Sequence, residues 1–452
     1  MKLKTLHISA LFTCCAALQT QAGNPLVHDV GMADPHIFIF EDKAYMYTTR
    51  DDKEAATEEW NMPDWNIWSS DDLVDWKHER VVKPSETYIG DSIYCWAPNA
   101  ATKNGKYYFY LSNKLIDTAV MVSDSPAGPF KDALGKPLLP EDLTPTHEYD
   151  ICVLFDNGEP YIVFGALSGN REKAAHGHTY HIAKLNDDMI SLAEDPKPIV
   201  VNGPATFRGD KPNIHFHRGT YYLTTGAHWA ISDNLYGPYT VKWSESDDSH
   251  PHDWSRRAHG NFFEWNRQWF WVYCSFVTTH DEWKYRQSQM TYVHYKDNGD
   301  LVYDSELLNN HYAAGVGQYG ADWPVIQAEW FMGMSEGPEK REHPVKGFEI
   351  QNIQNGNSLR FPNIHNCPEN PVVNISYSST EKGTVTIKEN DASGAVVGSA
   401  DFDSTGSWET YATVAVPLKA GEAKATRSLF FEFSGEDGKE LIRVDSFTIS
   451  AK

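Results

Sequence analysis

The 452-residue sequence predicts an all-β protein, a five-bladed β-propeller followed by a jelly-roll-like β-sandwich. Three observations support this fold class. A unit made of a strand, a tight turn and an aromatic strand recurs five times. Turn-forming dipeptides separate the two strands of the unit, and the hydrophobic residues show no helical period. Aromatic residues, at 13% of the chain, suit packed sheets.

The repeat predicts the blades. Its copies begin at residues 34, 96, 150, 210 and 259. The spacing of about fifty to sixty residues leaves room for four antiparallel strands in each copy. Asn104-Gly105 and Asp156-Asn157-Gly158 lie between the two strands of the second and third copies, as expected for β-hairpins. Five such units in one chain are typical of a propeller.

The N-terminal residues 1–22 have the features of a signal peptide. Lys2 and Lys4 precede an apolar stretch, and small residues follow it at the expected cleavage site. We therefore expect a secreted or periplasmic protein. A lipoprotein acylated at Cys14 or Cys15 is the less favoured alternative, because neither cysteine follows the Gly, Ala or Ser that is usual there.

The propeller is expected over residues 23–321 and the sandwich over 322–452, where short alternating strands follow a Gly-, Pro- and charge-rich stretch. No organic cofactor and no transmembrane segment are indicated. The formal charge of −23 argues against a nucleic-acid partner, and the oligomeric state stays open. Widely spaced cysteines without a CxxC pair predict buried free thiols rather than a zinc site or a disulfide framework: Cys95, Cys152, Cys274 and Cys367.

Polar residues at the start of the repeats indicate the functional site. The innermost strands of a propeller begin around one mouth of its central axis, so residues that open the repeats converge in space. Asp34, Asp150 and Asp210 open three copies at what we expect to be the equivalent point, and His259 opens the fifth. A single Asp is more often a turn residue. Three clustered carboxylates instead suit a shared proton or a bound cation, and glycoside cleavage needs such a pairing of acid and base.

Residues 30–305 resemble glycoside hydrolase family 43, the five-bladed propeller hydrolases of plant polysaccharides. Four motifs carry the resemblance: Met32-Ala33-Asp34-Pro35, Trp96-Ala97-Pro98, Tyr149-Asp150-Ile151 and Ala258-His259-Gly260. The resemblance implies an inverting reaction in which Asp34 is the general base and Asp150 adjusts the pKa and position of the acid. It also implies that Trp96 lies beside the sugar, that Arg286 is an active-site arginine, and that His259 lies near a cation such as calcium.

The blade-four motif departs from the family pattern. The family usually has Glu-Gly-Pro or Glu-Ala-Pro there, whereas this chain has Asp210-Lys211-Pro212, whose carboxyl is one methylene shorter. Three interpretations stay open: Asp210 is the acid, Glu148 or His228 serves instead, or the propeller binds glycans without cleaving them. His228 is also expected to contact substrate, with capping of the sheet as the alternative. The His-rich run at 249–254 is expected to be a loop over the mouth rather than a metal cluster.

The C-terminal sandwich resembles a family 6 carbohydrate-binding module. Ile326-Gln327-Ala328-Glu329 and Val444-Asp445-Ser446-Phe447 are among the matching pieces. The resemblance implies that Glu329 and Asp445 hold a structural calcium ion. Trp408 or Tyr411 could stack on a sugar, but Arg443 stands where sugar-binding members often have Asn. A sandwich that only buttresses the propeller remains the alternative.

Taken together, the residues and the two resemblances predict a glycosidase that acts on plant cell-wall polysaccharide or its oligosaccharides. An α-L-arabinofuranosidase or β-xylosidase is the expected type. A β-galactosidase- or galactanase-type exo-hydrolase of the same fold is the alternative among enzymes, and a non-catalytic glycan-binding propeller is the alternative outside them.

Overall fold

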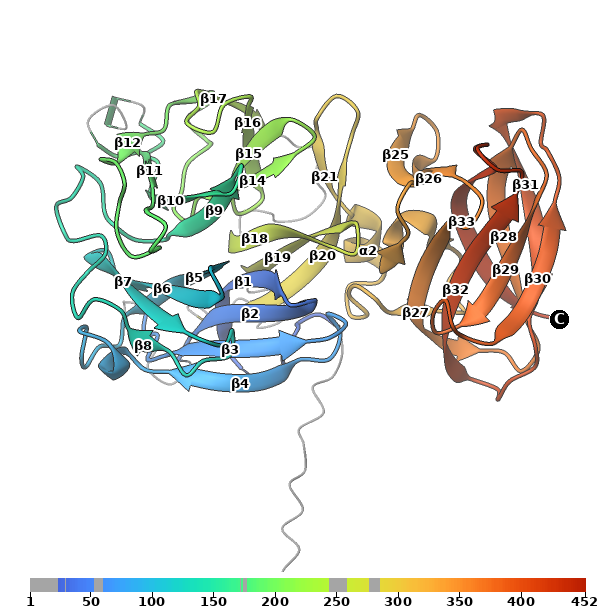
Figure 1. Cartoon of the computed structure of the whole chain (residues 1–452), viewed down its shortest axis with the longest axis horizontal. Coiled ribbons are helices and arrows are strands. Elements are labelled where there is room, and N and C mark those ends of the chain that lie inside the picture. Colours follow the sequence, from blue (N-terminus) through green and yellow to red (C-terminus); the bar gives the residue numbers. More distant parts are fainter. Residues whose placement is uncertain are drawn as a thin grey trace, which may run out of the picture.

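The structure, a computed structural model, describes residues 23–28, 30–52, 60–170, 172–173, 177–243, 258–275 and 285–452. The expected signal peptide and the His-rich run lie outside these residues. Sheets dominate the described part, with five radial sheets in the first two thirds of the chain and two stacked sheets after them (Figure 1). None of its helices is long and apolar enough to cross a membrane.

Each radial sheet is built from consecutive strands, counted here from the axis outward. Blade four carries a fifth strand, β13, which pairs parallel with β17. Blade one consists of β1 (Met32–Phe40), β2 (Lys43–Arg50), β3 (Trp65–Ser70) and β4 (Lys77–Val82), and blade two of β5 (Cys95–Lys103), β6 (Lys106–Asn113), β7 (Asp117–Ser123) and β8 (Lys131–Asp132). Blade three consists of β9 (Cys152–Asp156), β10 (Glu159–Gly165), β11 (Tyr180–Lys184) and β12 (Lys197–Pro198), and blade four of β14 (Asn213–His217), β15 (Thr220–Thr225), β16 (His228–Ser232), β17 (Tyr239–Trp243) and β13 (Val201–Asn202). Blade five consists of β18 (Ala258–Trp265), β19 (Gln268–Ser275), β20 (Gln287–Tyr295) and β21 (Leu301–Tyr303).

Buried asparagines on the inner strands tie neighbouring blades together. Asn261 of β18 bonds both backbone groups of Ile37 in β1, accepting from its N–H at 2.9 Å and donating to its carbonyl at 2.8 Å. Asn99 of β5 accepts from the N–H of Val153 in β9 at 3.0 Å. Because β18 and β1 come from opposite ends of the propeller sequence, the Asn261 pair closes the ring.

The C-terminal domain is a sandwich of two six-stranded sheets, whose strands alternate buried and exposed residues. Phe361, Phe431 and Phe447 meet edge to face or tilted in its core. One sheet contains β22 (Tyr319–Gly320), β27 (Ser358–Cys367), β32 (Ala425–Gly435), β29 (Gly383–Glu389), β30 (Val396–Phe402) and β24 (Gly333–Met334); the other contains β25 (Glu339–His343), β26 (Gly347–Ile353), β33 (Ile442–Ala451), β28 (Pro371–Ser379), β31 (Ser407–Pro417) and β23 (Ile326–Gln327). Because β22 pairs with β27, the first strand of the sandwich lies shortly before residue 322, the start that the sequence predicts for this domain.

Blades one and five share one apolar core with the sandwich. The connection runs through α2 (Ser305–Asn310) and the 3-10 turn η4 (Ala328–Trp330). Gln268 of β19 donates to the carbonyls of Glu329 and Phe331 at 2.7 and 2.9 Å, and Lys340 of β25 donates to the carbonyl of Val293 at 2.8 Å. These contacts fix the sandwich against the side of the propeller (Figure 1).

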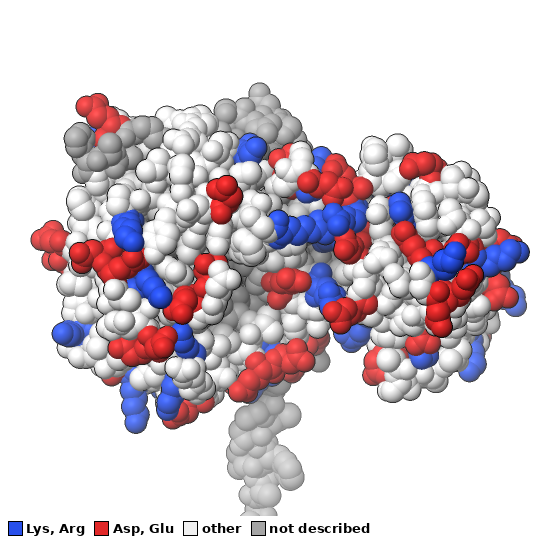
Figure 2. Space-filling view, turned by 45° about the horizontal axis from the view of Figure 1, so that its top comes forward, with Lys and Arg blue, Asp and Glu red and all other residues white. Residues whose placement is uncertain are grey.

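The four cysteines of the two domains are buried and free, which confirms the prediction of unpaired thiols. A short 3-10 turn, η1 (Pro84–Glu86), follows β4, the outermost strand of blade one. Acidic and basic side chains are interspersed over the face shown in Figure 2, which suits a neutral partner better than a polyanion.

Candidate active site

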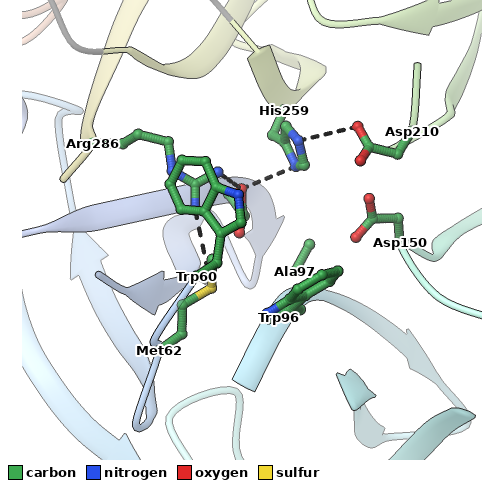
Figure 3. A pocket seen from close by; sticks show the side chains of 9 residues that line it. Trp60, Met62, Trp96, Ala97, Asp150, Asp210, His259 and Arg286 are labelled. Carbon is green, nitrogen blue, oxygen red and sulfur yellow. Dashed lines mark hydrogen bonds and ion pairs between the residues drawn. The ribbon is translucent and has the colours of Figure 1, made fainter. Parts of the chain in front are cut away.

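One pocket at the mouth of the propeller gathers most of the predicted site residues. Its cavity volume is about 170 Å³. Its carboxylates and cations come from blades one, three, four and five, and Trp96 comes from blade two. The lining residues are Asp34, Trp60, Met62, Trp96, Ala97, Asp150, Asp210, His259 and Arg286 (Figure 3).

A left-handed residue begins the inner strand in four of the blades. Asp34, Asp150 and His259 have φ angles of 50°, 54° and 50°, a conformation that is uncommon outside glycine. In blade four this conformation belongs to Lys211, with φ of 54°. The prediction of three equivalent aspartates is therefore wrong in one respect: Asp34 and Asp150 are equivalent, and Asp210 stands one residue earlier in its blade. Asp210 still reaches the pocket from that position.

Asp34 is a buried carboxylate held by cations. Its Oδ1 accepts from Arg286 Nη1 at 2.8 Å and forms an ion pair with His259 Nδ1 at 2.9 Å, and its Oδ2 accepts from the hydroxyl of Thr49 at 3.2 Å. Burial alone would raise the pKa of Asp34, but the charges of Arg286 and His259 outweigh it and hold the pKa far below its usual value. Asp34 is therefore ionised whenever the protein is folded, as a general base must be.

Arg286 is positioned by Asp51, a residue that the sequence analysis did not identify. Its Nε and Nη2 donate to the two oxygens of Asp51 at 3.0 and 2.9 Å, and its backbone N–H adds a third bond at 2.8 Å. The guanidinium carbon lies 4.2 Å from the ring centre of Trp60, which covers one face (Figure 3). Such a bidentate pair fixes the orientation of Arg286 and, through it, that of Asp34.

Asp150 and Asp210 form a pair of neighbouring carboxyl groups. Their oxygens and a ring nitrogen of His259 lie within 4.8 Å of one another. Burial, followed by the charge of Asp210, raises the pKa of Asp150 to about 7, and Asp150 Oδ2 has no hydrogen-bond partner among the described residues. Burial also raises the pKa of Asp210, but the charge of His259 outweighs it and lowers the value. The Asp210 side chain is 45% exposed in the open pocket, so it is the member of the pair that a substrate would meet.

His259 bridges the two ends of the site. Its Nε2 lies 3.3 Å from Asp210 Oδ1, opposite the 2.9 Å contact of Nδ1 with Asp34 (Figure 3). The Asp34 contact is a close ion pair rather than an aligned hydrogen bond. Burial lowers the pKa of His259, but the charges of the two carboxylates outweigh it and raise the pKa well above its usual value, which favours the imidazolium form. One ring between Asp34 and Asp210 keeps their carboxylates closer than about 9.5 Å, the upper limit for an inverting pair.

The carboxylates of Asp150 and Asp210 and a ring nitrogen of His259 lie within 4.8 Å of one another and could together hold a cation on the open side of the pocket, whereas the space behind the pocket does not suit one. Both ring nitrogens of His259 face carboxylates, Nδ1 that of Asp34 and Nε2 that of Asp210. In addition, the ammonium of Lys211 already binds the carbonyls of Pro98 and Ile151 behind the pocket, at 3.1 Å each. We therefore route no chemical step through a metal at this position.

The remaining predicted residues divide between the pocket and its surroundings. Trp96 lines the pocket, where its indole face is available to a sugar. Glu148 points elsewhere: its Oε1 accepts from the N–H and the hydroxyl of Thr144, both at 2.8 Å. His228, at the start of β16, is buried 6.4 Å from the ring of Phe207 and does not line the pocket. The geometry thus brings neither alternative acid to the site.

In the sandwich, Glu329 belongs to η4 and Asp445 to β33, two elements that are in contact. Glu329 is buried and its Oε2 has no hydrogen-bond partner among the described residues, so burial raises its pKa well above the usual value. Asp445 accepts from the Ser446 hydroxyl at 3.0 Å and from Lys346 at 3.4 Å. An orphaned buried carboxylate oxygen beside a second carboxylate suits a hard cation such as calcium.

The sugar-stacking positions expected in the sandwich are occupied by its own side chains. The guanidinium carbon of Arg443 lies 4.3 Å from the ring centre of Trp408 and covers that face. The hydroxyl of Tyr411 donates to Glu349, which is fully buried. These contacts favour the interpretation in which the usual cleft does not present a free aromatic platform.

Comparison with known families decides the affiliation. The family model described as "Glycosyl hydrolases family 43" matches residues 22–300. The chain belongs to this family. A second family model, "Carbohydrate binding module (family 6)", matches residues 327–451. As a family 43 member the protein is a glycosidase, which confirms the predicted enzyme class, and its fold class is confirmed as well.

Two of the similar proteins align along nearly the whole chain, and a third aligns along 63% of it. An arabinoxylan arabinofuranohydrolase of Paenibacillus polymyxa is 23% identical over 482 residues, covering 94% of this chain and 74% of that protein. A crystal structure of a family 43 arabinoxylan arabinofuranohydrolase from Bacillus subtilis, in complex with cellotetraose, covers 96% of this chain and 99% of its own at 21% identity and a TM-score of 0.54. A β-xylosidase/α-arabinofuranosidase from a compost microbial metagenome, solved with xylotriose in a calcium-free form, covers 63% of this chain and 97% of its own at 25% identity and a TM-score of 0.51.

Proposed function

We propose that this family 43 glycosidase removes α-L-arabinofuranosyl or β-xylosyl units from plant cell-wall polysaccharide or its oligosaccharides, with inversion at the anomeric carbon. The observation that carries the proposal is the pocket at the mouth of the propeller, which brings Asp34 together with the neighbouring carboxyl groups of Asp150 and Asp210. The Paenibacillus relative, which aligns along both domains, supports an arabinoxylan substrate.

Each residue has a part in a single displacement. Asp34 takes a proton from a water molecule, whose oxygen attacks the anomeric carbon. The bond from that carbon to the leaving oxygen breaks, and that oxygen receives, through Asp210, the proton that Asp150 holds at rest. Asp150 keeps the proton available beside Asp210, since two adjacent carboxylates cannot both ionise easily. Trp96 offers an apolar face to the sugar ring.

The assignment is tested with the purified protein and a panel of substrates. We expect release of arabinose or xylose from nitrophenyl glycosides and from arabinoxylan, with proton NMR showing the inverted anomer first. Release of galactose alone would support the galactosidase alternative. Retention in affinity gels without any released sugar would support the glycan-binding alternative and overturn the proposal.

The pH dependence follows from the carboxyl pair. Because the raised pKa of Asp150 is about 7, its proton is present below that pH and is lost as the pH rises through it. The value of kcat/KM is therefore expected to fall tenfold for each pH unit well above 7, while the ionised Asp34 gives no acidic limb near neutral pH. In Asp150→Asn, the alkaline limb should move to lower pH, because His259 then dominates the pKa of Asp210. A kcat/KM that increases through pH 7 in the parent would contradict this.

The sandwich is proposed to hold a structural calcium ion through Glu329 and Asp445. The ion would neutralise the two carboxylates and link η4 to β33. We expect chelation with EDTA to lower the melting temperature by about 5 °C and calcium to restore it. Glu329→Gln, which removes one charge at almost unchanged volume, should abolish this response. An unchanged melting temperature in EDTA would rule the site out.

Export is proposed from residues 1–22, whose basic start and apolar stretch are typical of a cleaved signal. N-terminal sequencing of protein recovered from the periplasm or medium should begin near Gly23. Metabolic labelling with palmitate would instead reveal acylation at Cys14 or Cys15.

A further inference from the structure

Lys211 places a buried ammonium group behind the catalytic pocket. The residue is 1% exposed, and its Nζ donates to the carbonyls of Pro98 and Ile151 at 3.1 Å each. Pro98 lies in the inner strand of blade two, and Ile151 directly precedes the inner strand of blade three. The side chain of a blade-four residue thus crosses to two other blades.

The charge of Lys211 also acts on residues of blade one. The charge of Lys211 helps lower the pKa of His36 and of Asp34, and it acts on Asp150 of blade three as well. Contacts or electrostatic effects therefore reach the ammonium from blades one, two, three and four. Only a position close to the propeller axis satisfies all of them.

Burial lowers the pKa of Lys211, and the charges of Asp150 and Asp34 act against that shift and favour the ammonium. Removing a lone ammonium from water costs several kcal/mol, so it persists only where opposite charge compensates. The described carboxyl groups at the centre number four and the cationic side chains three, a balance that leaves one carboxyl to carry a proton. They are Asp34, Asp51, Asp150 and Asp210 with Arg286, His259 and Lys211.

We propose that the Lys211 ammonium is a built-in substitute for a metal cation on the propeller axis, occupying the backbone carbonyls that such an ion would bind. Carbonyl oxygens are ligands of hard cations, and an ammonium satisfies the same oxygens as a donor. In the family pattern, Gly or Ala stands at the position of Lys211, and neither residue has a side chain long enough to reach the axis. This inference concerns the positioning of the catalytic carboxylates and so deepens the proposed function.

Replacing Lys211 by glycine is expected to create a metal site. Glycine accepts the φ angle of 54° without strain and leaves the two carbonyls free. In a Glu329→Gln background, which removes the proposed calcium site of the sandwich, Lys211→Gly should bind one calcium ion per chain by mass spectrometry of the metal content. Calcium should raise its melting temperature by about 5 °C over the value in EDTA. Lys211→Met, which fills the space without a charge, should bind no calcium and gain no stability.

The protein that keeps Lys211 provides the decisive comparison even where Lys211→Gly does not fold. In the Glu329→Gln background it should retain no calcium and melt at the same temperature in EDTA and in calcium. One retained calcium ion with a chelation-sensitive melting temperature would overturn the inference, as would a folded Lys211→Gly that ignores calcium. None of these measurements needs glycosidase activity, so a failure of the proposed function would be recognised separately.

Discussion

Asp34→Asn is expected to lower kcat on arabinoxylan oligosaccharides by about 10³-fold or more while the protein stays folded. Asparagine has nearly the same shape as Asp34 and can still accept a bond from Arg286. It cannot take a proton from water, however, because its amide is not basic. The ionised state of Asp34, secured by Arg286 and His259, is the property that the substitution removes.

The fold should survive because Arg286 keeps its other partner. Three hydrogen bonds to Asp51 remain, so the guanidinium is not left buried without an opposite charge. Circular dichroism and the melting temperature measure this directly. Asp64→Asn is the matched control: Asp64 pairs with Arg50 at 2.6 Å in the same blade but does not line the pocket, so its loss should leave kcat within about twofold. An Asp34→Asn protein that cleaves as fast as the parent would show that the base is misassigned.

The blades were predictable because their signal is repeated and local. Aromatic strands separated by turns such as Asn104-Gly105 specify a hairpin wherever they occur, and five hairpin pairs leave few architectures. The convergence of Asp34 and Asp150 followed from that architecture alone. The order of the blades along the sequence was therefore sufficient to predict that these two residues meet at the mouth of the propeller.

What escaped prediction depends on single backbone angles and on loops. The left-handed residue of blade four is Lys211 rather than Asp210, and nothing in the residue pattern distinguishes the two. Asp51 and Trp60 flank Arg286 from the end of β2 and from the loop beyond it, where no motif marks them. One signal was available: a lysine at a position where the family resemblance gives Gly or Ala indicates a charge with a specific partner.

Asp210→Asn tests whether Asp210 or Glu148 is the acid, an assignment that the sequence left open. If Asp210 protonates the leaving oxygen, its loss should lower kcat by about 10³-fold on oligosaccharides, whose leaving sugar hydroxyl needs a proton. On nitrophenyl glycosides the leaving group departs as a stabilised anion, so the loss should be about tenfold or less. Glu148→Gln serves as the control, because Glu148 is bound to Thr144 outside the pocket.

Each outcome of this comparison has a structural meaning. A large loss in Asp210→Asn that depends on the leaving group assigns the acid to the residue that is 45% exposed in the pocket, with Asp150 as its buried partner. An equal loss on both substrates would show that Asp210 only positions the sugar. A full loss in Glu148→Gln with an active Asp210→Asn would transfer the role to Glu148 and require that the segment after Thr144 rearrange when substrate binds. The side chain of Asp210 is one methylene shorter than the glutamate of the family pattern. The position of its carboxyl group therefore depends on the contact with His259 Nε2, which lies 3.3 Å from Asp210 Oδ1 on the side that faces Asp34.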